Sequence, residues 1–365
     1  FMLTPDSFSR IVASPNILVP KAYSKTRSPI SFTKRSVDLT NLPNFSDVQS
    51  AADVLDGVSI KTPVLFNTPL DQITGAEIFL KCENLQRINA FKFRGAWNAM
   101  NKMSDAERSH GVVTFSSGNH AQAVALAGHL LGVSTTIVMP NNAPAVKRLG
   151  TEKYATRVID FDPNTEKRED ITDALISKHD YTVLPPFDHP NVIAGQGTAA
   201  LELFNSCGAL DTLLVPLGGG GLLSGCALSA EALSPECKVI GVEPEAGDDG
   251  ARSFRSGRIE RVNNPQTIAD GTRTESLGQL TFEIIRNLVH DVVCVSEDDI
   301  VDATKALFEH ARLVVEPSGA LGLAALLSGV IKSQGRVGVL LSGGNIDLSL
   351  MSHILGHPQA GASIP

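Results

Sequence analysis

The sequence predicts an α/β protein made of two doubly wound domains, each built on an open parallel sheet. Short apolar runs, typical of strands buried on both faces, recur along the chain, and helical patterns separate them. The chain has 365 residues, of which 42% are hydrophobic and 19% are charged, and two domains are usual at this length. A ligand is then expected in the cleft between the domains, near the carboxyl ends of the strands.

The elements can be assigned in order from about residue 44 onward. The first is a helix at 47–57, which has apolar residues at helical spacing and Ser46 in the position of a cap. Further helices are predicted at 120–132, 143–150 and 164–178. Strands are predicted at 111–115, 134–139, 156–161, 181–185, 212–217, 238–243, 291–295 and 336–341. This alternation of strands and helices is what indicates parallel sheets.

Composition and charge narrow the classes of function. The formal net charge of −8 argues against nucleic acid as a partner. No apolar run reaches the length of a membrane span, so we expect a soluble protein with no membrane partner. The five cysteines form no CxxC pair and no metal-binding spacing, which is typical of free thiols in a reducing compartment. We therefore expect a cytoplasmic location.

The first 42 residues differ in composition from the rest of the chain. They contain six Lys or Arg, two acidic residues, seven Ser and four Pro, with little periodicity. Such a composition is typical of a disordered tail, and it overlaps with that of an organellar transit peptide. The prolines weaken the amphipathic helix that a transit peptide needs. We expect residues 1–43 to form a flexible tail or a targeting segment.

The stretch NAFKFRGAWN at residues 89–98 places Lys92 between two phenylalanines. A lysine in a partly apolar pocket has a lowered pKa, so part of it is neutral and can attack an aldehyde. Taken alone, the stretch is better explained by a strand edge or helix start at which Lys92 extends to the surface.

The stretch LLVPLGGGGLLSG at 213–225 carries a clearer signal. A strand ends, Gly218, Gly219, Gly220 and Gly221 follow, and an apolar helix begins. N–H groups at such a helix start can hold a phosphate, and glycines let the backbone approach it closely. The glycine spacing of dinucleotide sites and the Gly-Lys-Ser/Thr of P-loops are both missing from this stretch. The stretch predicts a phosphate site for another ligand, with a tight turn as the alternative.

Three further loops gather polar side chains at strand ends. FSSGNHAQ at 115–122 suits either ligand binding or ordinary helix capping. LLSGGNIDL at 340–348 offers a hydroxyl that can bond a ring nitrogen, or it forms another turn. GVEPEAGDDGARSF at 241–254 contains four acidic residues, whose oxygens suit Mg²⁺ or Ca²⁺, although a solvated acidic loop is the usual explanation.

Together and in this order, these stretches resemble the fold-type II enzymes that use pyridoxal 5′-phosphate (PLP), whose fold is similar to that of the tryptophan synthase β subunit. More narrowly, the chain resembles the group of serine racemases, serine/threonine dehydratases and threo-3-hydroxyaspartate dehydratases. The resemblance extends over residues 47–348. It is carried by KCENLQRINAFKFRGAWNAM, VVTFSSGNHAQA, APAVKRLG, PPFDHPNVIAGQGTAALE, VPLGGGGLLSG, GVEPEAGDD, IADGTRT, VEPSGALG and LSGGNID.

The resemblance implies a cofactor site in the interdomain cleft. Lys92 would form the covalent imine with PLP, and Phe91 would help to hold it there. A serine at the pyridine nitrogen leaves the ring unprotonated, which makes it a weaker electron sink and favours loss of a β-leaving group. The implied cofactor contacts are Gly218, Gly219, Gly220, Gly221 and Leu222 at the phosphate, Asn119 at the ring hydroxyl, Ser342 at the ring nitrogen, and Glu316.

The implied reaction is α,β-elimination of water from serine, threonine or threo-3-hydroxyaspartate, which gives a 2-keto acid and ammonia. Ser117 matches the serine that faces the lysine across the cofactor in the racemases, so racemisation of serine or aspartate is implied as a further activity. We hypothesise that Arg273 pairs with the second carboxylate of 3-hydroxyaspartate, the alternative being a surface arginine. The implied substrate contacts are Ser116, Ser117, Asn119, His120, Arg168, Asp270, Arg273 and Thr274.

The resemblance also implies a metal site and an assembly. Glu243, the Gly247 carbonyl and Asp249 would hold Mg²⁺, Mn²⁺ or Ca²⁺, and the enzyme would be a homodimer that acts on a small amino acid. The implied division is a large PLP-binding domain at 44–110 and 189–352, a small domain at 111–188, and a C-terminal tail at 353–365.

Three departures from the animal racemases favour a dehydratase: Ala90 replaces a serine, Phe115 replaces a histidine, and PPFDHP at 185–190 is more like dehydratases or microbial members. The alternatives are a racemase as the main activity and a β-replacement enzyme of the cysteine or cystathionine synthase type. A non-catalytic ligand sensor is disfavoured by the intact motifs, and a nicotinamide oxidoreductase by the glycine spacing.

Overall fold

A computed structural model of the chain describes residues 42–332 and 335–356, which belong to one compact unit. The predicted tail at 1–43 lies almost entirely outside these residues. Of the predicted tail at 353–365, residues 353–356 continue the helix Leu348–Gly356, and the rest lies outside the described residues.

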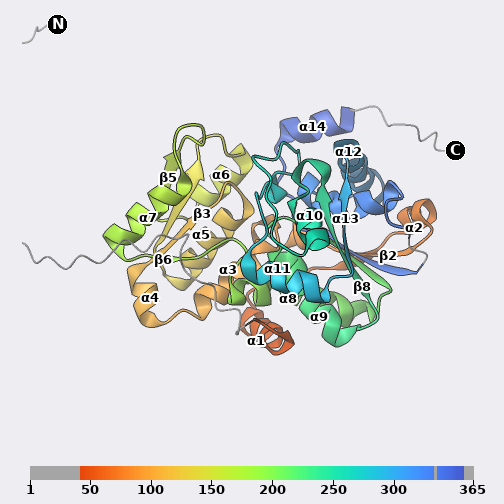
Figure 1. Ribbon diagram of the computed structural model, residues 1–365, viewed down its shortest axis with the longest axis horizontal. Coiled ribbons are helices and arrows are strands. Elements are labelled where there is room, and N and C mark those ends of the chain that lie inside the picture. Colours follow the sequence, from red (N-terminus) through yellow and green to blue (C-terminus); the bar gives the residue numbers. More distant parts are fainter. Residues whose placement is uncertain (1–41, 333–334, 357–365) are drawn as a thin grey trace, which may run out of the picture. The chain divides into compact units, whose positions relative to one another are not determined.

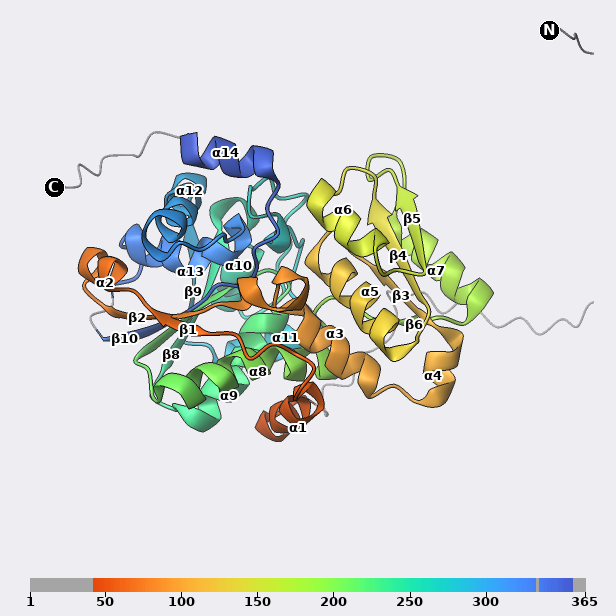
Figure 2. The same ribbon diagram turned by 180° about the vertical axis from the view of Figure 1, so that it is seen from behind.

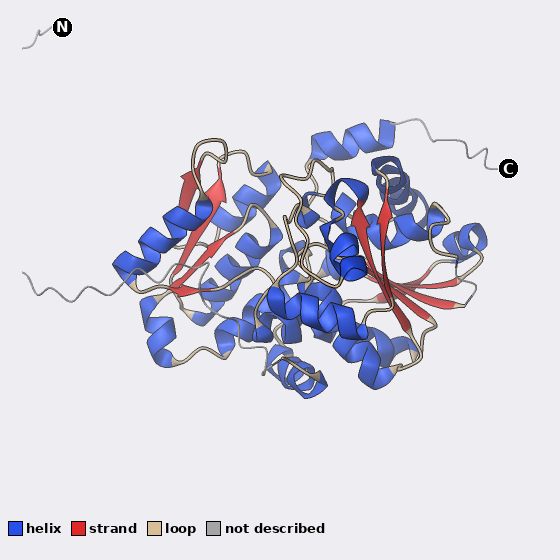
Figure 3. Cartoon of the chain, viewed as in Figure 1, coloured by secondary structure: helices blue, strands red, loops and turns tan. Residues whose placement is uncertain are grey.

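The described residues form two sheets (Figures 1 and 3). The six-stranded sheet has the order β1-β2-β10-β7-β8-β9, in which only β1 is antiparallel to its neighbour. The four-stranded sheet has the order β5-β4-β3-β6 and is parallel throughout. The strands are β1 (Val64–Phe66), β2 (Glu77–Lys81), β3 (Val112–Phe115), β4 (Thr135–Pro140), β5 (Arg157–Phe161), β6 (Thr182–Val183), β7 (Thr212–Pro216), β8 (Lys238–Pro244), β9 (Asp291–Val295) and β10 (Arg336–Leu340).

Each strand predicted from an apolar run is present, with ends within two residues of the prediction. Strands β1 and β2 were not predicted, and the antiparallel edge strand β1 corrects the expectation of a purely parallel sheet. No helix in the described part of the chain is long and apolar enough to cross a bilayer. The helices are α1 (Phe45–Leu55), α2 (Thr68–Thr74), α3 (Lys92–Asn101), α4 (Asp105–His110), α5 (Asn119–Leu131), α6 (Ala145–Glu152), α7 (Arg168–His179), α8 (Pro190–Cys207), α9 (Gly221–Leu233), α10 (Asp249–Ser256), α11 (Gln279–Leu288), α12 (Glu297–Ala306), α13 (Pro317–Leu327) and α14 (Leu348–Gly356).

The start of helix α1 differs from the prediction, because Asn44 and not Ser46 is the cap. The Asn44 side chain accepts a hydrogen bond from the Ser46 N–H at 2.8 Å, and the Asp47 carboxylate accepts one from the Asn44 N–H at 2.9 Å. This reciprocal pair satisfies two N–H groups at the helix start, which a serine inside the first turn could not do.

Helices cover both faces of the six-stranded sheet. Along β7, Leu214 packs into the core that includes α13, whereas Leu213 and Val215 pack into the core that includes α8 and α9. Because successive strand residues point to opposite faces, this alternation means that both faces are buried. Helices α7 and α5 likewise lie on opposite faces of the four-stranded sheet (Figures 1 and 2). The doubly wound α/β prediction is confirmed.

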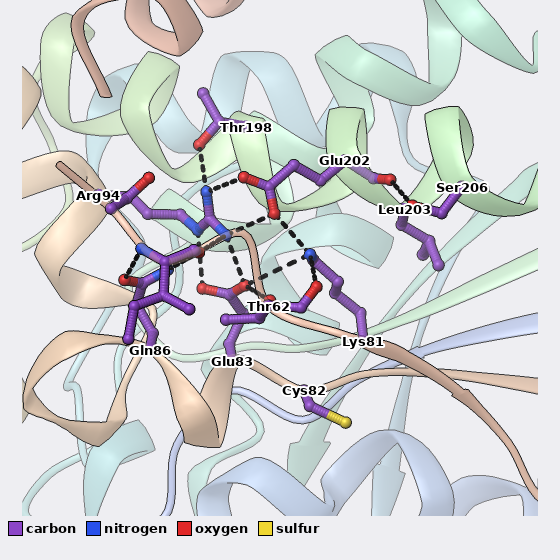
Figure 4. A network of polar contacts seen from close by, with 12 residues as sticks. Thr62, Lys81, Cys82, Glu83, Gln86, Arg94, Thr198, Glu202, Leu203 and Ser206 are labelled. Carbon is purple, nitrogen blue, oxygen red and sulfur yellow. Dashed lines mark hydrogen bonds and ion pairs between the residues drawn. The ribbon is translucent and has the colours of Figure 1, made fainter. Parts of the chain in front are cut away.

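A network of four charged side chains joins helix α3 to the six-stranded sheet (Figure 4). Arg94 forms ion pairs at 2.7 Å with both Glu83 and Glu202. Lys81, at the end of β2, lies 2.6 Å from Glu202 and 3.9 Å from Glu83. The side chains of Lys81, Glu83 and Arg94 are fully buried. The network therefore holds the first turn of α3 against β2 and α8.

Each charge in this network offsets part of the cost of burying its partners, although at Lys81 burial outweighs the two glutamates and the pKa is lowered. Burial alone would raise the pKa of Glu83, but Arg94 and Lys81 outweigh it and the pKa is lowered. Burial would likewise lower the pKa of Arg94, but the two glutamates raise it. Removing one member leaves an uncompensated buried charge, which is far more costly than the loss of an exposed pair.

We expect Arg94→Met to lower the free energy of unfolding by about 3–5 kcal/mol, because it leaves Glu83 buried without its partner. Chemical denaturation measures this change. The matched control is Arg258→Met, which removes an Arg–Glu pair of the same 2.7 Å length whose arginine is 79% exposed. Equal effects of the two substitutions would contradict the assignment of the network as a structural constraint.

Candidate active site

Lys92 is the first residue of helix α3, and the backbone before it is joined to the loop after β10. Ala90 forms an antiparallel bridge with Gly343, and the Phe91 N–H donates to the Ser342 carbonyl at 3.1 Å. The stretches NAFKFRGAWN and LLSGGNIDL, far apart in sequence, are thereby brought side by side.

The two residues before this junction have left-handed backbone, with φ of 56° at Ile88 and 54° at Asn89. For a β-branched residue this conformation is rare, and each such residue costs about 1–3 kcal/mol. The Asn345 side-chain amide donates to the Ile88 carbonyl at 2.7 Å, and the Gly344 N–H donates to the Asn89 carbonyl at 2.9 Å. The loop after β10 thus holds a strained turn that sets where Lys92 begins the helix.

The amine of Lys92 is largely removed from water. Its Nζ donates to the Pro186 carbonyl at 2.7 Å and lies 5.1 Å from the centre of the Phe91 ring. Burial lowers the pKa of Lys92 from its ordinary 10.5 to about 8. Part of it is therefore neutral near neutral pH and can act as a nucleophile or a base.

The glycine loop connects β7 to helix α9. Gly220 has φ of +94°, which side chains rarely adopt, and a Cβ at Gly219 would collide with the Phe187 ring. The first N–H groups of α9, at Gly221, Leu222 and Leu223, have no acceptor earlier in their own helix. Such a helix start attracts an anion, so the geometry fits a phosphate.

Residues 186–189 connect the amine to the glycine loop. The Pro186 carbonyl accepts from Lys92, and the next side chain, Phe187, packs against the glycines. The Asp188 carboxylate then accepts from the N–H groups of Gln279 and Leu280, which caps helix α11. This short segment therefore fixes where the amine and the anion site lie relative to one another.

The loop between β3 and α5 presents Asn119 in a fixed orientation. Its Nδ2 donates to the Glu316 carboxylate at 2.5 Å, and its Oδ1 accepts from the Asn345 amide at 2.9 Å. The second hydrogen of Nδ2 is then available for another acceptor. Ser116 Oγ accepts from the Gly118 N–H at 3.2 Å, and Ser117 is exposed.

Two predicted substrate residues carry buried polar atoms without a hydrogen-bond partner in the described part of the chain, Nδ1 of His120 and Oγ1 of Thr274. The His120 Nε2 lies 3.2 Å from the Leu184 carbonyl, and burial together with Lys92 lowers the pKa of His120 to about 3. In this arrangement Nε2 carries the proton and Nδ1 is an acceptor. Thr274 Oγ1 lies against the glycine loop, 3.5 Å from the place of a Cβ at Gly218.

The two predicted arginines occupy different positions. The guanidinium of Arg168 lies 4.9 Å from the centre of the Phe115 ring, which adjoins Ser116, and its Nε pairs with Glu169. Arg273 is exposed, and its Nε donates to the Thr267 carbonyl at 2.8 Å. Arg168 thus lies beside the β3–α5 loop. Arg273 bonds to the backbone of its own loop, at Thr267.

The remaining predicted cofactor and substrate residues lie in the same region. The Ser342 side chain is buried beside the Ser318 carbonyl, 3.5 Å from its Oγ. Glu316 caps the start of α13 and contacts Asn119, and Asp270 forms a 2.6 Å ion pair with Lys147.

The acidic loop after β8 buries two carboxylates, Glu243 and Asp249. Burial raises the pKa of Glu243 to about 9 and that of Asp249 to about 7, and Asp249 adds to the shift of Glu243 by repulsion. The Asp249 Oδ2 has no hydrogen-bond partner in the described part of the chain. Among the described residues, no group of three or more His, Cys, Asp or Glu side chains has an arrangement that could by itself hold a metal ion. Two buried carboxylates and an unpartnered oxygen still fit a cation that also uses a backbone carbonyl.

Several residues that shape the site carried no usable signal in the sequence. Lys147 is 1% exposed, but a lysine in APAVKRLG has the same appearance whether it is buried or solvated. The role of Pro186 depends on its backbone carbonyl, which no residue type reveals. Asn345 does carry a signal in the sequence, because it is a polar amide that directly follows Ser342 and the two glycines at the end of a strand.

A family profile described as "Pyridoxal-phosphate dependent enzyme" matches residues 56–343. The chain is 50% identical over 324 residues to the L-threo-3-hydroxyaspartate ammonia-lyase of Saccharomyces cerevisiae, covering 88% of this chain and 99% of that one. It is 47% identical to the serine racemase of Schizosaccharomyces pombe, covering 86% and 98%. The structure of maize serine racemase matches with a TM-score of 0.83 at 39% identity, covering 86% and 97%.

We expect the folded protein without ligand to become more stable as the pH rises from about 8 to 10.5 through the contribution of Lys92. In this window the unfolded chain still holds the lysine proton that the folded chain has lost, so the free energy of unfolding increases with pH. Denaturation at several pH values, compared with Lys92→Met, isolates this contribution. The same pH slope in both proteins would show that the amine is not perturbed.

Proposed function

Because the chain belongs to the family of pyridoxal-phosphate dependent enzymes, we propose that it removes water from a β-hydroxy amino acid and releases a 2-keto acid and ammonia. The observation that carries the proposal is the junction of a lysine amine, whose pKa is lowered to about 8, with a glycine loop at a helix start. Segment 186–189 contacts both of them. An amine for a carbonyl and an anion site for a phosphate are what this cofactor requires.

The residues present fit the cofactor. Lys92 would hold its carbonyl carbon, the N–H groups of Gly218–Gly221 and Leu222 its phosphate, and Ser342 its ring nitrogen. The fixed amide of Asn119 has one hydrogen to give to the ring oxygen, since its other contacts are taken by Glu316 and Asn345. Phe91 supplies an apolar wall beside the amine.

When bound, pyridoxal phosphate accepts the electron pair left behind when the α-proton is removed. Lys92 Nζ takes that proton, which its lowered pKa allows because the amine is partly neutral. The proton lost from the α-carbon and the hydroxide lost from the β-carbon sum to one water. A second water then converts the unsaturated amine to keto acid and ammonia, so the net reaction consumes no water.

Ser117 is the proposed second acid/base. Its exposed hydroxyl belongs to the loop that also carries Asn119, and a proton returned from it to the α-carbon would invert the substrate. Racemisation is therefore proposed as a further activity, and it becomes the main one if inversion outpaces elimination. β-Replacement of the cysteine synthase type remains the less favoured alternative.

The substrate is proposed to be serine, threonine or threo-3-hydroxyaspartate, with Ser116, Ser117, Asn119, His120 and Thr274 near its α-carboxylate. The relative at 50% identity supports the last of these substrates. Arg168, Asp270 and Arg273 remain candidates for the side-chain end, and Arg273 is the one proposed for a second carboxylate.

A divalent cation and a homodimer complete the proposal. Glu243, the Gly247 carbonyl and Asp249 would hold Mg²⁺, Mn²⁺ or Ca²⁺. We propose two domains: a large one made of residues 44–110 and 189–352, and a small one made of residues 111–188. The four-stranded sheet supports this division, because its strands all lie between residues 112 and 183. A cytoplasmic location is proposed, since all five cysteines are free thiols.

The test of the function is direct. The purified protein with pyridoxal phosphate and Mg²⁺ is given L-serine, D-serine, L-threonine and L-threo-3-hydroxyaspartate, and keto acid and enantiomer ratio are followed together. Keto acid formed faster than inversion supports the dehydratase. Inversion in excess of keto acid makes it a racemase, and turnover only with sulfide as nucleophile would overturn both.

We expect Ser117→Ala to slow inversion of serine by about 10²–10⁴-fold, because it removes a proton donor from one face only. Elimination, which needs only the Lys92 face, should fall much less. Chiral chromatography of the products measures both rates. Ser177→Ala, on the exposed face of α7, is the control, and a parallel loss of both activities in Ser117→Ala would contradict the two-base assignment.

We expect Mg²⁺ to stabilise the protein by about 2.7 kcal/mol at about 100 times its Kd, and Glu243→Gln to abolish this effect. The amide keeps an oxygen for the Ala251 N–H, but unlike the carboxyl group it cannot lose a proton and become an anionic ligand when the cation binds. Thermal unfolding with and without a chelator measures the change. Glu275→Gln, at an exposed ion pair, is the matched control, and an unchanged response in Glu243→Gln would place the cation elsewhere.

A further inference from the structure

Lys147 is a buried cation with no part in the reaction as described. It lies in the first turn of α6 and is 1% exposed. Its Nζ is 2.6 Å from the Asp270 carboxylate and 2.9 Å from the Glu316 carboxylate. Both partners come from segments far along the chain, beside the six-stranded sheet, whereas α6 packs on β5 and α5 of the four-stranded sheet.

Helix α6 has a second polar link to the same region. The Asp347 carboxylate accepts from the Val146 N–H at 3.1 Å, at the start of the helix. The first turn of α6 is therefore joined to the six-stranded side by hydrogen bonds and ion pairs.

Glu316 connects Lys147 to Asn119. One carboxylate oxygen of Glu316 faces Lys147, and the other accepts from the Asn119 amide at 2.5 Å. A Cβ at Gly343 would collide with this carboxylate, so Glu316 has little room to turn. The position of the Asn119 amide thus depends on a carboxylate that is itself held by Lys147.

The charges explain why a cation is needed here. Burial raises the pKa of Glu316, and Lys147 opposes that rise. Burial alone would lower the pKa of Lys147, but Glu316 and Asp270 raise it, so the amine stays charged. Without Lys147, the carboxylates of Asp270 and Glu316 would have lost the cation that compensates them. Glu316 would then take up a proton, and its contact with the Asn119 amide would change.

We propose that Lys147 is a positioning residue which, through Glu316, orients the Asn119 amide toward the cofactor ring and holds α6 against the six-stranded side. The proposal rests on the proposed function, because it takes Asn119 as a cofactor contact. The proposal gives Lys147 no contact with the substrate. Its side chain is 1% exposed, and its Nζ lies against the β3–α5 loop, 3.7 Å from the place of a Cβ at Gly118.

The experiment compares Lys147→Met, Lys147→Arg, Glu316→Gln and the double variant Lys147→Met/Glu316→Gln, with Lys153→Met at the exposed end of α6 as the control. Absorbance titration with pyridoxal phosphate gives the affinity and the position of the bound cofactor's band. Hydrogen exchange of the cofactor-free proteins gives the opening of 118–124 and 145–152. The double variant is included because Lys147→Met alone leaves buried charge unpaired and can fail to fold.

We expect Lys147→Met to weaken cofactor affinity by about tenfold, to displace the cofactor's band, and to speed exchange in both segments. Lys147→Arg should restore the band, and the Lys147→Met effect on affinity should be several-fold smaller when Glu316→Gln is already present. A variant with lower thermal stability but an unchanged band and affinity would overturn the proposal, as would equal effects in both backgrounds. If Lys147→Met does not fold, the cofactor affinity of the double variant is compared with that of Glu316→Gln. A large difference between these two affinities would overturn the proposal.

Failure of the proposed function is recognised separately. If the unmodified protein binds no pyridoxal phosphate, the function is wrong, and the exchange data still decide whether Lys147 holds the β3–α5 loop. Exchange in 118–124 and 145–152 that is unchanged by Lys147→Met would then overturn the inference.

Discussion

The arrangement of the site depends on the charge network of Arg94, Glu83, Glu202 and Lys81. A buried charge must be paired, and three fully buried charges that share Glu202 can all be paired in very few geometries. The network therefore fixes the rotation of α3 about its axis, and its position along that axis, more narrowly than apolar packing alone would. Lys92 precedes Arg94 by two residues, so its amine inherits this fixed position.

Opposite this fixed helix, the amide of Asn119 is held by contacts of another kind. Helices α3 and α8 pack through fully buried residues, whereas α6 meets the six-stranded side through the ion pairs of Lys147 and the capping contact of Asp347. These ion pairs are themselves buried, since the side chains of Lys147 and Glu316 are each 1% exposed, so their loss would leave unpaired charge. The amine of Lys92 and the amide of Asn119 are thus both positioned by buried charges, in two separate networks.

Local patterns in the sequence were enough to predict most strands and the glycine loop, because buried parallel strands and a Gly-rich helix start depend on consecutive residues. The stretch around Lys92, taken alone, favoured a lysine that extends to the surface, because the contact of its amine with Pro186 lies 94 residues away in the chain. The cap of α1 was misassigned because Asn44 and Asp47 act as a reciprocal pair. Lys147 was missed because its partners are more than a hundred residues away, and the edge strand β1 because it has only three residues.

The strained turn before Lys92 has a consequence for how the protein is made. Ile88 and Asn89 are held by the backbone and amide of residues 344 and 345, and the Ile88–Asn345 contact spans 257 residues. On the ribosome the chain emerges from its N-terminus, so this contact cannot form until nearly all of it has been translated. The turn that sets where Lys92 begins its helix is therefore completed only after nearly the whole chain has been synthesised.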